Sequence, residues 1–407
     1  MFPSRRITTS GGDVFRNEYS LEFDGSNDYV DCGNDSSLNW GDGDGTVACW
    51  FKTTDTGTSD IVMNGSYSTD GKGYVLLIDS NGKFQFAIDD NSGAGVKYVL
   101  STTSANDGIW HHIAGVREGT NIRLYVDGVE DAASPTAIAS YGSLDISDKF
   151  FIGAGTAGTG GSAGNFYQGN IDEVAIWNTS LTSNQIKTLY NNREPFNAKN
   201  IALSNLKGYW RMGDGVVDNH GAFDTDDNGI IGDESIPTTL GGEMIVDGDF
   251  ALTGTQSAST TGTYWTTEAN WTIADGKATF DDTDSGYYRL EQPSAKMNTA
   301  FATGVIYKMS CLISDVTETG NMAYFILTSD DGNEFDIIST ARTAANGTHT
   351  FYFKANSSNN GDGFSIKVHT VSTSAWKITN ISIKPVTGGN IGIMTNMTAS
   401  DIVTDTH

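Results

Sequence analysis

The chain has 407 residues and a formal net charge of -26, with 48 glycines beside 6 prolines. This length is enough for two or three domains that each bury a core. The acidic charge argues against a nucleic-acid-binding protein, because contacts to phosphate need clustered Lys and Arg, and the sequence has no such stripe.

We expect no membrane span and no targeting signal in this sequence. No apolar run reaches spanning length, and the polar arm at residues 1–18 lacks the apolar stretch of a secretory signal. Cys32, Cys49 and Cys311 have neither the number nor the spacing of a disulfide framework or a zinc site. These features predict folding in a reducing cytoplasm.

The first half of the chain, residues 19–195, reads as one strand after another. Runs such as GYVLLID (73–79) and KFQFAID (83–89) are joined by turn residues, here Asn81-Gly82, and Asp127-Gly128 closes another pair. This pattern predicts an antiparallel sandwich. A single short helix follows, because Thr182 and Gln185 have the spacing of a capping box.

The second half contains another β-rich region. Residues 196–243 read as a connector with an Asp-rich loop, residues 244–387 again alternate with a period of two, and residues 388–407 form a tail without a strong pattern. The predicted fold class is therefore all-β, with two antiparallel jelly-roll-type β-sandwiches and one short helix after the first.

The stretch GNIDEVAIWN (169–178) places two carboxylates, Asp172 and Glu173, side by side. On a regular strand, neighbouring side chains point to opposite faces, whereas a glycosidase needs two carboxyls on the same side. We therefore expect no catalytic residues here, and we interpret the stretch as a strand of the sandwich.

The connector contains the sharpest local signal for a metal, FDTDDNGIIGDE (223–234). Its oxygen-rich spacing resembles a calcium loop, although Ser235 stands where a bidentate Glu is usual and no helices flank it. A solvated acidic turn is the alternative. The predicted calcium ligands are Asp224, Asp226, Asn228, Ile230, Asp233 and Glu234.

Aromatic side chains in the second β-rich region suggest a sugar-stacking surface. Ring faces pack well on the C–H groups of an uncharged sugar. Most of these residues are expected in the core, with one or two exposed, because a sandwich needs large side chains between its sheets. The candidate carbohydrate-binding residues are Trp265, Trp271, Tyr287, Tyr288 and Trp376.

Three motifs of the first half resemble the laminin G-like, concanavalin A-like jelly roll. They are SLEFDGSNDYVD (20–31), GIWHHIAGVREGTNIRLYVDG (108–128) and GNIDEVAIWNTSLTSNQIKTLY (169–190). In the second half, MIVDGDF (244–250) and ITNISIKPV (378–386) resemble the first and last strands of carbohydrate-binding modules. That family often holds a structural calcium, but Ala251 and Asn380 stand at its usual ligand positions, so the resemblance implies no metal there.

The segments LKGYWRMGDG (206–215) and NIGIMTNMT (390–398) resemble the two ends of the lead-in segment that accompanies such jelly rolls. This resemblance implies that the second sandwich is an insertion and that the tail pairs near the connector.

The combination resembles bacteriophage fibre or appendage proteins. It implies a virion protein that folds in the host cytoplasm, binds cell-surface glycans without catalysis, and meets other virion proteins through its N-terminal arm. A homo-oligomer is expected, and trimers are common in fibres. A purely structural appendage role is the alternative, and a glycan-degrading enzyme is disfavoured by the carboxylate geometry.

Overall fold

The computed structural model describes residues 15–66, 71–139, 141–156, 162–215, 230–236, 239–281, 286–318, 324–339, 346–370, 374–397, 399–404 and 407. The chain divides into two compact units. Unit 1 comprises Met1–His220, Ile230–Pro237 and Gly389–His407, and unit 2 comprises Gly221–Gly229 and Thr238–Gly388. Both consist of antiparallel sheets, which confirms the predicted all-β class.

The first sheet of unit 1 has nine strands among the described residues. Their order is β10 (Val129–Glu130), β9 (Asn121–Val126), β8 (His111–Glu118), β3 (Gly45–Lys52), β15 (Gln168–Trp177), β1 (Tyr19–Asp24) and β31 (Ile402–Thr404), with β11 (Thr136–Ala137) on β9 and β16 (Leu206–Trp210) on β15. At the turn between β9 and β10, Asp127 and Gly128 both have positive φ, as the predicted hairpin requires.

The second sheet of unit 1 has eight strands in the described part of the chain. Their order is β17 (Ile230–Ile231), β30 (Gly392–Thr395), β2 (Tyr29–Asp31), β12 (Phe150–Ile152), β4 (Ser59–Gly65), β5 (Gly73–Ile78), β6 (Lys83–Asp89) and β7 (Lys97–Ser104). A small hairpin of β13 (Gly155–Thr156) and β14 (Ala163–Gly164) lies beside them.

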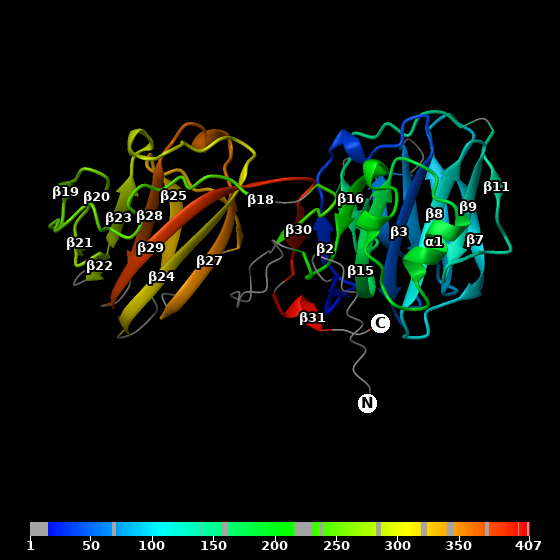
Figure 1. Cartoon of the computed structure of the whole chain (residues 1–407), viewed down its shortest axis with the longest axis horizontal. Helices are drawn as coiled ribbons and strands as arrows, with labels where there is room; N and C mark the ends of the chain where they lie inside the picture. Colours follow the sequence, from blue (N-terminus) through cyan, green and yellow to red (C-terminus); the bar gives the residue numbers. More distant parts are fainter. Residues whose placement is uncertain are drawn as a thin grey trace. The chain divides into compact units, whose positions relative to one another are not determined.

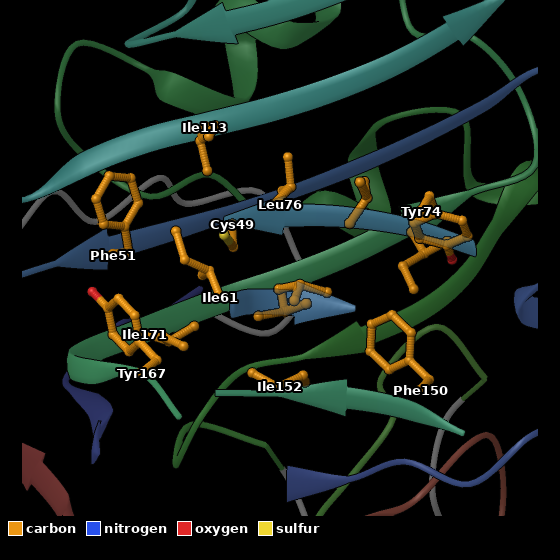
Figure 2. Packing of buried hydrophobic residues seen from close by; sticks show 14 of the residues in the cluster. Cys49, Phe51, Ile61, Tyr74, Leu76, Ile113, Phe150, Ile152, Tyr167 and Ile171 are labelled. Carbon is orange, nitrogen blue, oxygen red and sulfur yellow. The ribbon is translucent and has the colours of Figure 1, made fainter. Parts of the chain in front are cut away.

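The core of unit 1 lies between these two sheets. Alternate residues of each strand point into it, and the opposite ones face outward. Figure 2 shows part of this packing, in which side chains from both sheets interdigitate. The residues labelled there are Cys49, Phe51, Ile113, Tyr167 and Ile171 with Ile61, Tyr74, Leu76, Phe150 and Ile152, and all are buried.

The predicted helix is α1 (Ser183–Tyr190). The Thr182 side chain accepts the Gln185 N–H and the Gln185 side chain accepts the Thr182 N–H, which confirms the capping box. Its buried residues, Ile186 and Leu189, pack on the outer face of the nine-stranded sheet. The short 3-10 helices are η1 (Ser36–Leu38), η2 (Ala198–Asn200), η3 (Leu203–Asn205), η4 (Ser294–Lys296), η5 (Ser357–Asn359) and η6 (Ala399–Asp401). Among the described residues, no helix is long and apolar enough to cross a membrane.

Unit 2 is inserted into unit 1. The chain leaves after β17 and returns in β30, which pairs with both β17 and β2, and Figure 1 shows β30 beside β2. Asp233 and Asn390 lie on either side of the insertion and are joined by a hydrogen bond of 2.8 Å from the Asn390 N–H to Asp233 Oδ2. Residues 389–407, for which the sequence shows no strong pattern, thus complete both sheets of unit 1.

Unit 2 is a sandwich of its own. Over the described residues, one sheet has seven strands and the other has five. The seven-stranded sheet runs β21 (Trp271–Ala274), β22 (Lys277–Asp281), β29 (Ser374–Thr387), β24 (Ile306–Glu318), β27 (Gly347–Lys354) and β26 (Asp336–Ser339), with β18 (Thr239–Leu240) on β29. The five-stranded sheet runs β19 (Thr260–Thr261), β20 (Thr266–Thr267), β23 (Gly286–Gln292), β28 (Phe364–Thr370) and β25 (Tyr324–Ser329).

The returning strand β30 gives a test of the insertion. Met394 is fully buried in the core of unit 1, so Met394→Ala should lower the free energy of unfolding of unit 1 by about 2–5 kcal/mol. Urea unfolding, fitted separately for each unit, measures the loss. Thr404→Ala, at an exposed position of β31, is the control and should change stability by less than about 0.5 kcal/mol. An equal loss in both variants would contradict an integral role for β30.

Candidate functional site

The outer face of the nine-stranded sheet carries an open polar groove in unit 1. Its volume is about 570 Å³, which falls in the range of about 300–1,000 Å³ seen for ligand pockets. Residues from β1, β3, β15 and the loops at the same end of the sandwich line it. They are Glu22, Phe23, Asp24, Asp28, Lys52, Thr53, Thr54, Gly108, Gln168, Gly169, Asn170 and Asp401.

Strand register places the groove's polar side chains in rows. Glu22 on β1 is opposite Asn170 on β15, which is opposite Lys52 on β3. The next row joins Asp24 to Gln168. Because the neighbouring residues in the sequence point into the core, these side chains point outward and present both hydrogen-bond donors and acceptors.

One wall of the groove is a tight turn after β1. Asp24 Oδ1 accepts the Ser26 N–H at 2.7 Å, and Asp28 Oδ2 accepts the Asp24 N–H at 3.0 Å. Burial raises the pKa of Asp28 to about 6, and the negative charges of Asp24 and Asp401 act in the same direction. The groove is therefore lined by this acidic turn together with the amides of Gln168 and Asn170 and the ammonium of Lys52.

Beyond Asn170, strand β15 carries the paired carboxylates, and here the strand-alternation prediction is wrong. The register of β15 with β3 shifts between Asp172 and Ala175, and Glu173 has a φ of 50°. This β-bulge turns both carboxylates to the same side. The Asn17 Nδ2 group donates to Asp172 Oδ2 at 2.7 Å and to Glu173 Oε1 at 2.9 Å.

The two carboxylates are closed off by the chain's own groups. Arg211 Nε lies 3.2 Å from Glu173 Oε1, and the Tyr209 hydroxyl donates to Glu173 Oε2. His407 Nε2 lies 3.4 Å from Asp172 Oδ2. Burial raises the pKa of Asp172 well above its usual value, and the Glu173 charge raises it further. Both side chains are buried, at 0% and 6% exposure for the two residues, so they do not face the groove.

This carboxylate cluster holds residues 15–19 in place. Besides the Asn17 contacts, Asp214 Oδ2 accepts the N–H groups of Glu18 and Tyr19 at 2.8 and 3.0 Å. The Arg211 guanidinium lies 4.5 Å from the centre of the Phe15 ring. The pair therefore anchors residues 15–19 to strand β15.

A second ionic cluster ties together loops near the groove. The ring nitrogens of His111 lie 2.9 Å from Asp127 Oδ2 and 3.2 Å from Asp107 Oδ1. Burial alone lowers the pKa of His111, but the hydrogen bonds and charges of Asp127 and Asp107 outweigh it, and the pKa is raised. When the imidazole is protonated, both of its nitrogens can donate to these carboxylates.

The calcium loop lies mostly outside the described residues, which include neither Asp224 nor Asp226 nor Asn228. Ile230 is in β17. Asp233 is buried and accepts the N–H groups of Tyr209 and Ser235 at 2.9 and 2.8 Å, and Glu234 Oε2 pairs with Lys199 Nζ at 3.0 Å. Within the described residues, no group of three or more His, Cys, Asp or Glu is arranged to hold a metal.

Burial corrects the prediction that five aromatic residues of unit 2 bind carbohydrate. Trp265, Trp271 and Trp376 are 0%, 0% and 1% exposed, because they fill the core of unit 2 between its sheets. Tyr288 is half-buried against that core. Tyr287 alone of the five is well exposed, at 56%, with Lys367 Nζ 4.5 Å from its ring centre.

The groove residues themselves have only a weak signal in the sequence. Alternation within SLEFDG and GNIDEV places Glu22 and Asn170 on the polar face of each strand. What the sequence does not show is that β1 and β15 are neighbours, because that pairing joins residues about 150 positions apart.

The His111 cluster predicts a pH-dependent contribution to stability. With a raised folded-state pKa, its contribution is fully present below the unfolded-state pKa of about 6.5 and is lost as the pH rises through the folded-state pKa. His111→Gln should therefore be less stable than wild type near about pH 5.5, with a smaller difference near about pH 8.5.

Thermal unfolding across this pH range measures the difference. Asp28 and Asp60, whose pKa values are raised to about 6 and about 7, are present in both proteins and cancel in it. Asp107→Asn, which removes the more exposed carboxylate, should give part of the effect. A difference that does not change with pH would count against an imidazolium at this position.

Known proteins match unit 1. Residues 24–187 match the family model described as the concanavalin A-like lectin/glucanases superfamily, of the laminin G type. The rat (Rattus norvegicus) protein "Sushi, von Willebrand factor type A, EGF and pentraxin domain-containing protein 1" is 29% identical over 153 residues, which is 35% of this chain and 4% of that protein. The chain thus spans a small fraction of that relative.

Two solved structures are also similar. The heptameric SAP-like pentraxin of Limulus polyphemus has a TM-score of 0.36 and 16% identity, over 44% of this chain and 84% of the pentraxin. A putative carbohydrate-binding protein of Bacteroides ovatus has a TM-score of 0.39 and 16% identity, over 57% of this chain and 62% of that one. The family match, together with the two packed antiparallel sheets, assigns unit 1 to the laminin G-like form of the concanavalin A-like lectin fold.

Proposed function

We propose that unit 1 binds glycans in the polar groove on its nine-stranded sheet. The observation that carries the proposal is the groove itself, where Glu22, Asn170, Lys52 and Gln168 converge on a lectin-like scaffold. Carboxylate and amide oxygens accept hydrogen bonds from sugar hydroxyls, and amide and ammonium groups donate to them. The mixture suits a neutral glycan, because the acidic wall disfavours an anionic one.

The wider role in this proposal is adhesion by a bacteriophage virion fibre or decoration protein to a cell-surface glycan. The resemblance of the two sandwiches to laminin G-like and carbohydrate-binding modules supports it. The alternative is a purely structural appendage protein, in which the groove has no ligand and the sandwiches only build the particle.

The same proposal has no catalytic step. Asp172 and Glu173 share one side of β15, but Asn17, Tyr209 and Arg211 occupy their oxygens. A general acid or base must reach the substrate within hydrogen-bond distance. Burial of both groups supports binding rather than hydrolysis.

Glycan-array binding by the full chain tests the groove. Glu22→Ala and Gln168→Ala remove exposed side chains that line it, and each should weaken retention of the bound glycan on the order of tenfold through lost hydrogen bonds. Asn184→Ala, exposed on α1, is the matched control and should bind like wild type. Full binding by both groove variants would sink the proposed site, and no retained glycan at all would favour the structural alternative.

Calcium binding to residues 224–230 is part of the proposal and has its own test. A cation held by Asp224, Asp226, Asn228 and the Ile230 carbonyl would stabilise the native state by about 2.7 kcal/mol at a concentration of about one hundred times Kd. Calcium should then raise the Tm, and EDTA should reverse the rise. Asp224→Ala should abolish this response, with Asp275→Ala, in an exposed turn of unit 2, as the control. An equal Tm with calcium and EDTA would leave only an acidic turn.

A further inference from the structure

The outer face of the seven-stranded sheet of unit 2 gathers lysines. In β24, Tyr307, Met309, Cys311 and Ile313 point into the core, so Lys308 points outward between them. By the same alternation, Lys384 lies outward beside buried Ile383 on β29. Figure 1 shows these strands side by side with β27.

Register brings three of these lysines together. Lys308 is directly opposite Lys384 on one side and Tyr352 on the other. Lys354, two residues beyond Tyr352, is on the same face and diagonal to Lys308, which corresponds to about 7–8 Å between such positions. The three ammonium groups therefore come from three adjacent strands.

This arrangement is electrostatically costly without a partner. Like charges directly opposite each other destabilise a sheet. Within the described residues, Lys308, Lys354 and Lys384 make no ion pair, although the chain has 50 acidic residues against 24 basic ones. On the same face, Lys377 shows the ordinary solution, with its ammonium 2.8 Å from Asp315.

Asp336 on β26 is directly opposite Lys354, which leaves Lys308 and Lys384 as the lysines without an acidic residue directly opposite. Another nearby carboxylate, that of Glu243, is already engaged. Its Oε1 accepts the N–H groups of Ile245 and Ile383, at 3.0 and 2.9 Å, and its Oε2 accepts the Ser382 hydroxyl. Lys308 Nζ lies 5.6 Å from the centre of the Tyr352 ring, and burial lowers the pKa of this lysine. An arriving anion would restore the favourable environment that the ammonium lacks.

We infer that Lys308, Lys354 and Lys384 form a binding surface for a polysaccharide that carries carboxylate or sulfate groups. Ser310, one row along the same face, supplies a hydroxyl beside the charges, whereas the hydroxyl of Ser382 opposite it is donated to Glu243. The inference deepens the proposed glycan binding, on which it rests for the class of ligand, but it concerns a separate surface in unit 2.

Charge density favours a polysaccharide over a nucleic acid. Duplex DNA carries one charge per about 1.7 Å, and its binding needs many neutralising contacts. Three lysines on a chain of net charge -26 do not supply these contacts. A polymer with sparse anionic groups meets less long-range repulsion and can still pair with each ammonium.

The test measures binding of the full chain to four probes: polygalacturonate, dextran sulfate, neutral dextran and duplex DNA. Wild type should bind at least one of the two acidic polysaccharides, more weakly as salt rises, and the two together identify carboxylate or sulfate as the preferred group. The double variant Lys308→Gln/Lys384→Gln should lose on the order of tenfold or more in affinity.

The matched control is Lys187→Gln/Lys207→Gln in unit 1, which makes the same change in net charge and should bind like wild type. Because Lys308→Gln/Lys384→Gln removes a repulsive pair, its Tm should equal or exceed that of wild type, which separates lost binding from lost folding.

Unchanged affinity in the double variant, equal binding of neutral and sulfated dextran, or binding of DNA alone would each overturn the inference. Its outcome is independent of the groove. If Glu22→Ala and Gln168→Ala keep full glycan binding while Lys308→Gln/Lys384→Gln loses binding to the acidic polymers, only the proposed groove is ruled out.

Discussion

The β-bulge in strand β15 is the constraint on which unit 1 depends. One edge of β15 is shared by two strands, since β1 pairs with residues 168–171 and β16 with residues 174–177. The bulge at Asp172 and Glu173 lies at the junction between them. There Asp214 accepts the N–H groups of Glu18 and Tyr19 at the start of β1, and Asn17 and Arg211 contact the carboxylates of the bulge.

The same strand separates the buried part of the sheet face from the accessible part. On one side of the bulge, the helix and residues 15–19 cover the outer face. On the other side, Asn170 and Gln168 line open space. Residues only a few positions apart thus have opposite roles. The bulge interrupts the regular strand pairing at the point where the helix and residues 15–19 begin to cover the outer face of the sheet. The carboxylate pair is buried among contacts that hold the fold together, and the proposed binding groove lies next to it.

Sequence patterns predicted the elements of this chain better than their contacts. The strands, the Asp127-Gly128 turn and the capping box of α1 follow from local alternation and turn chemistry. The side of the strand on which Glu173 lies could not be predicted in this way, because a positive φ at a glutamate has no sequence signature. Burial of Trp265, Trp271 and Trp376 was the expected majority outcome for large side chains in a sandwich. The groove and the opposed lysines depend on register between distant strands, which alternation alone does not determine.

Charge distinguishes the two surfaces and the ligands that each is suited to bind. In the groove, Glu22 and Asp24 are exposed beside a single lysine, so an anionic sugar would meet repulsion while a neutral one gains hydrogen bonds. On unit 2, Lys308 and Lys384 oppose each other without a carboxylate partner in the described residues, so the balance is reversed. The two proposed sites therefore differ in chemistry, one for neutral sugars and one for acidic sugars.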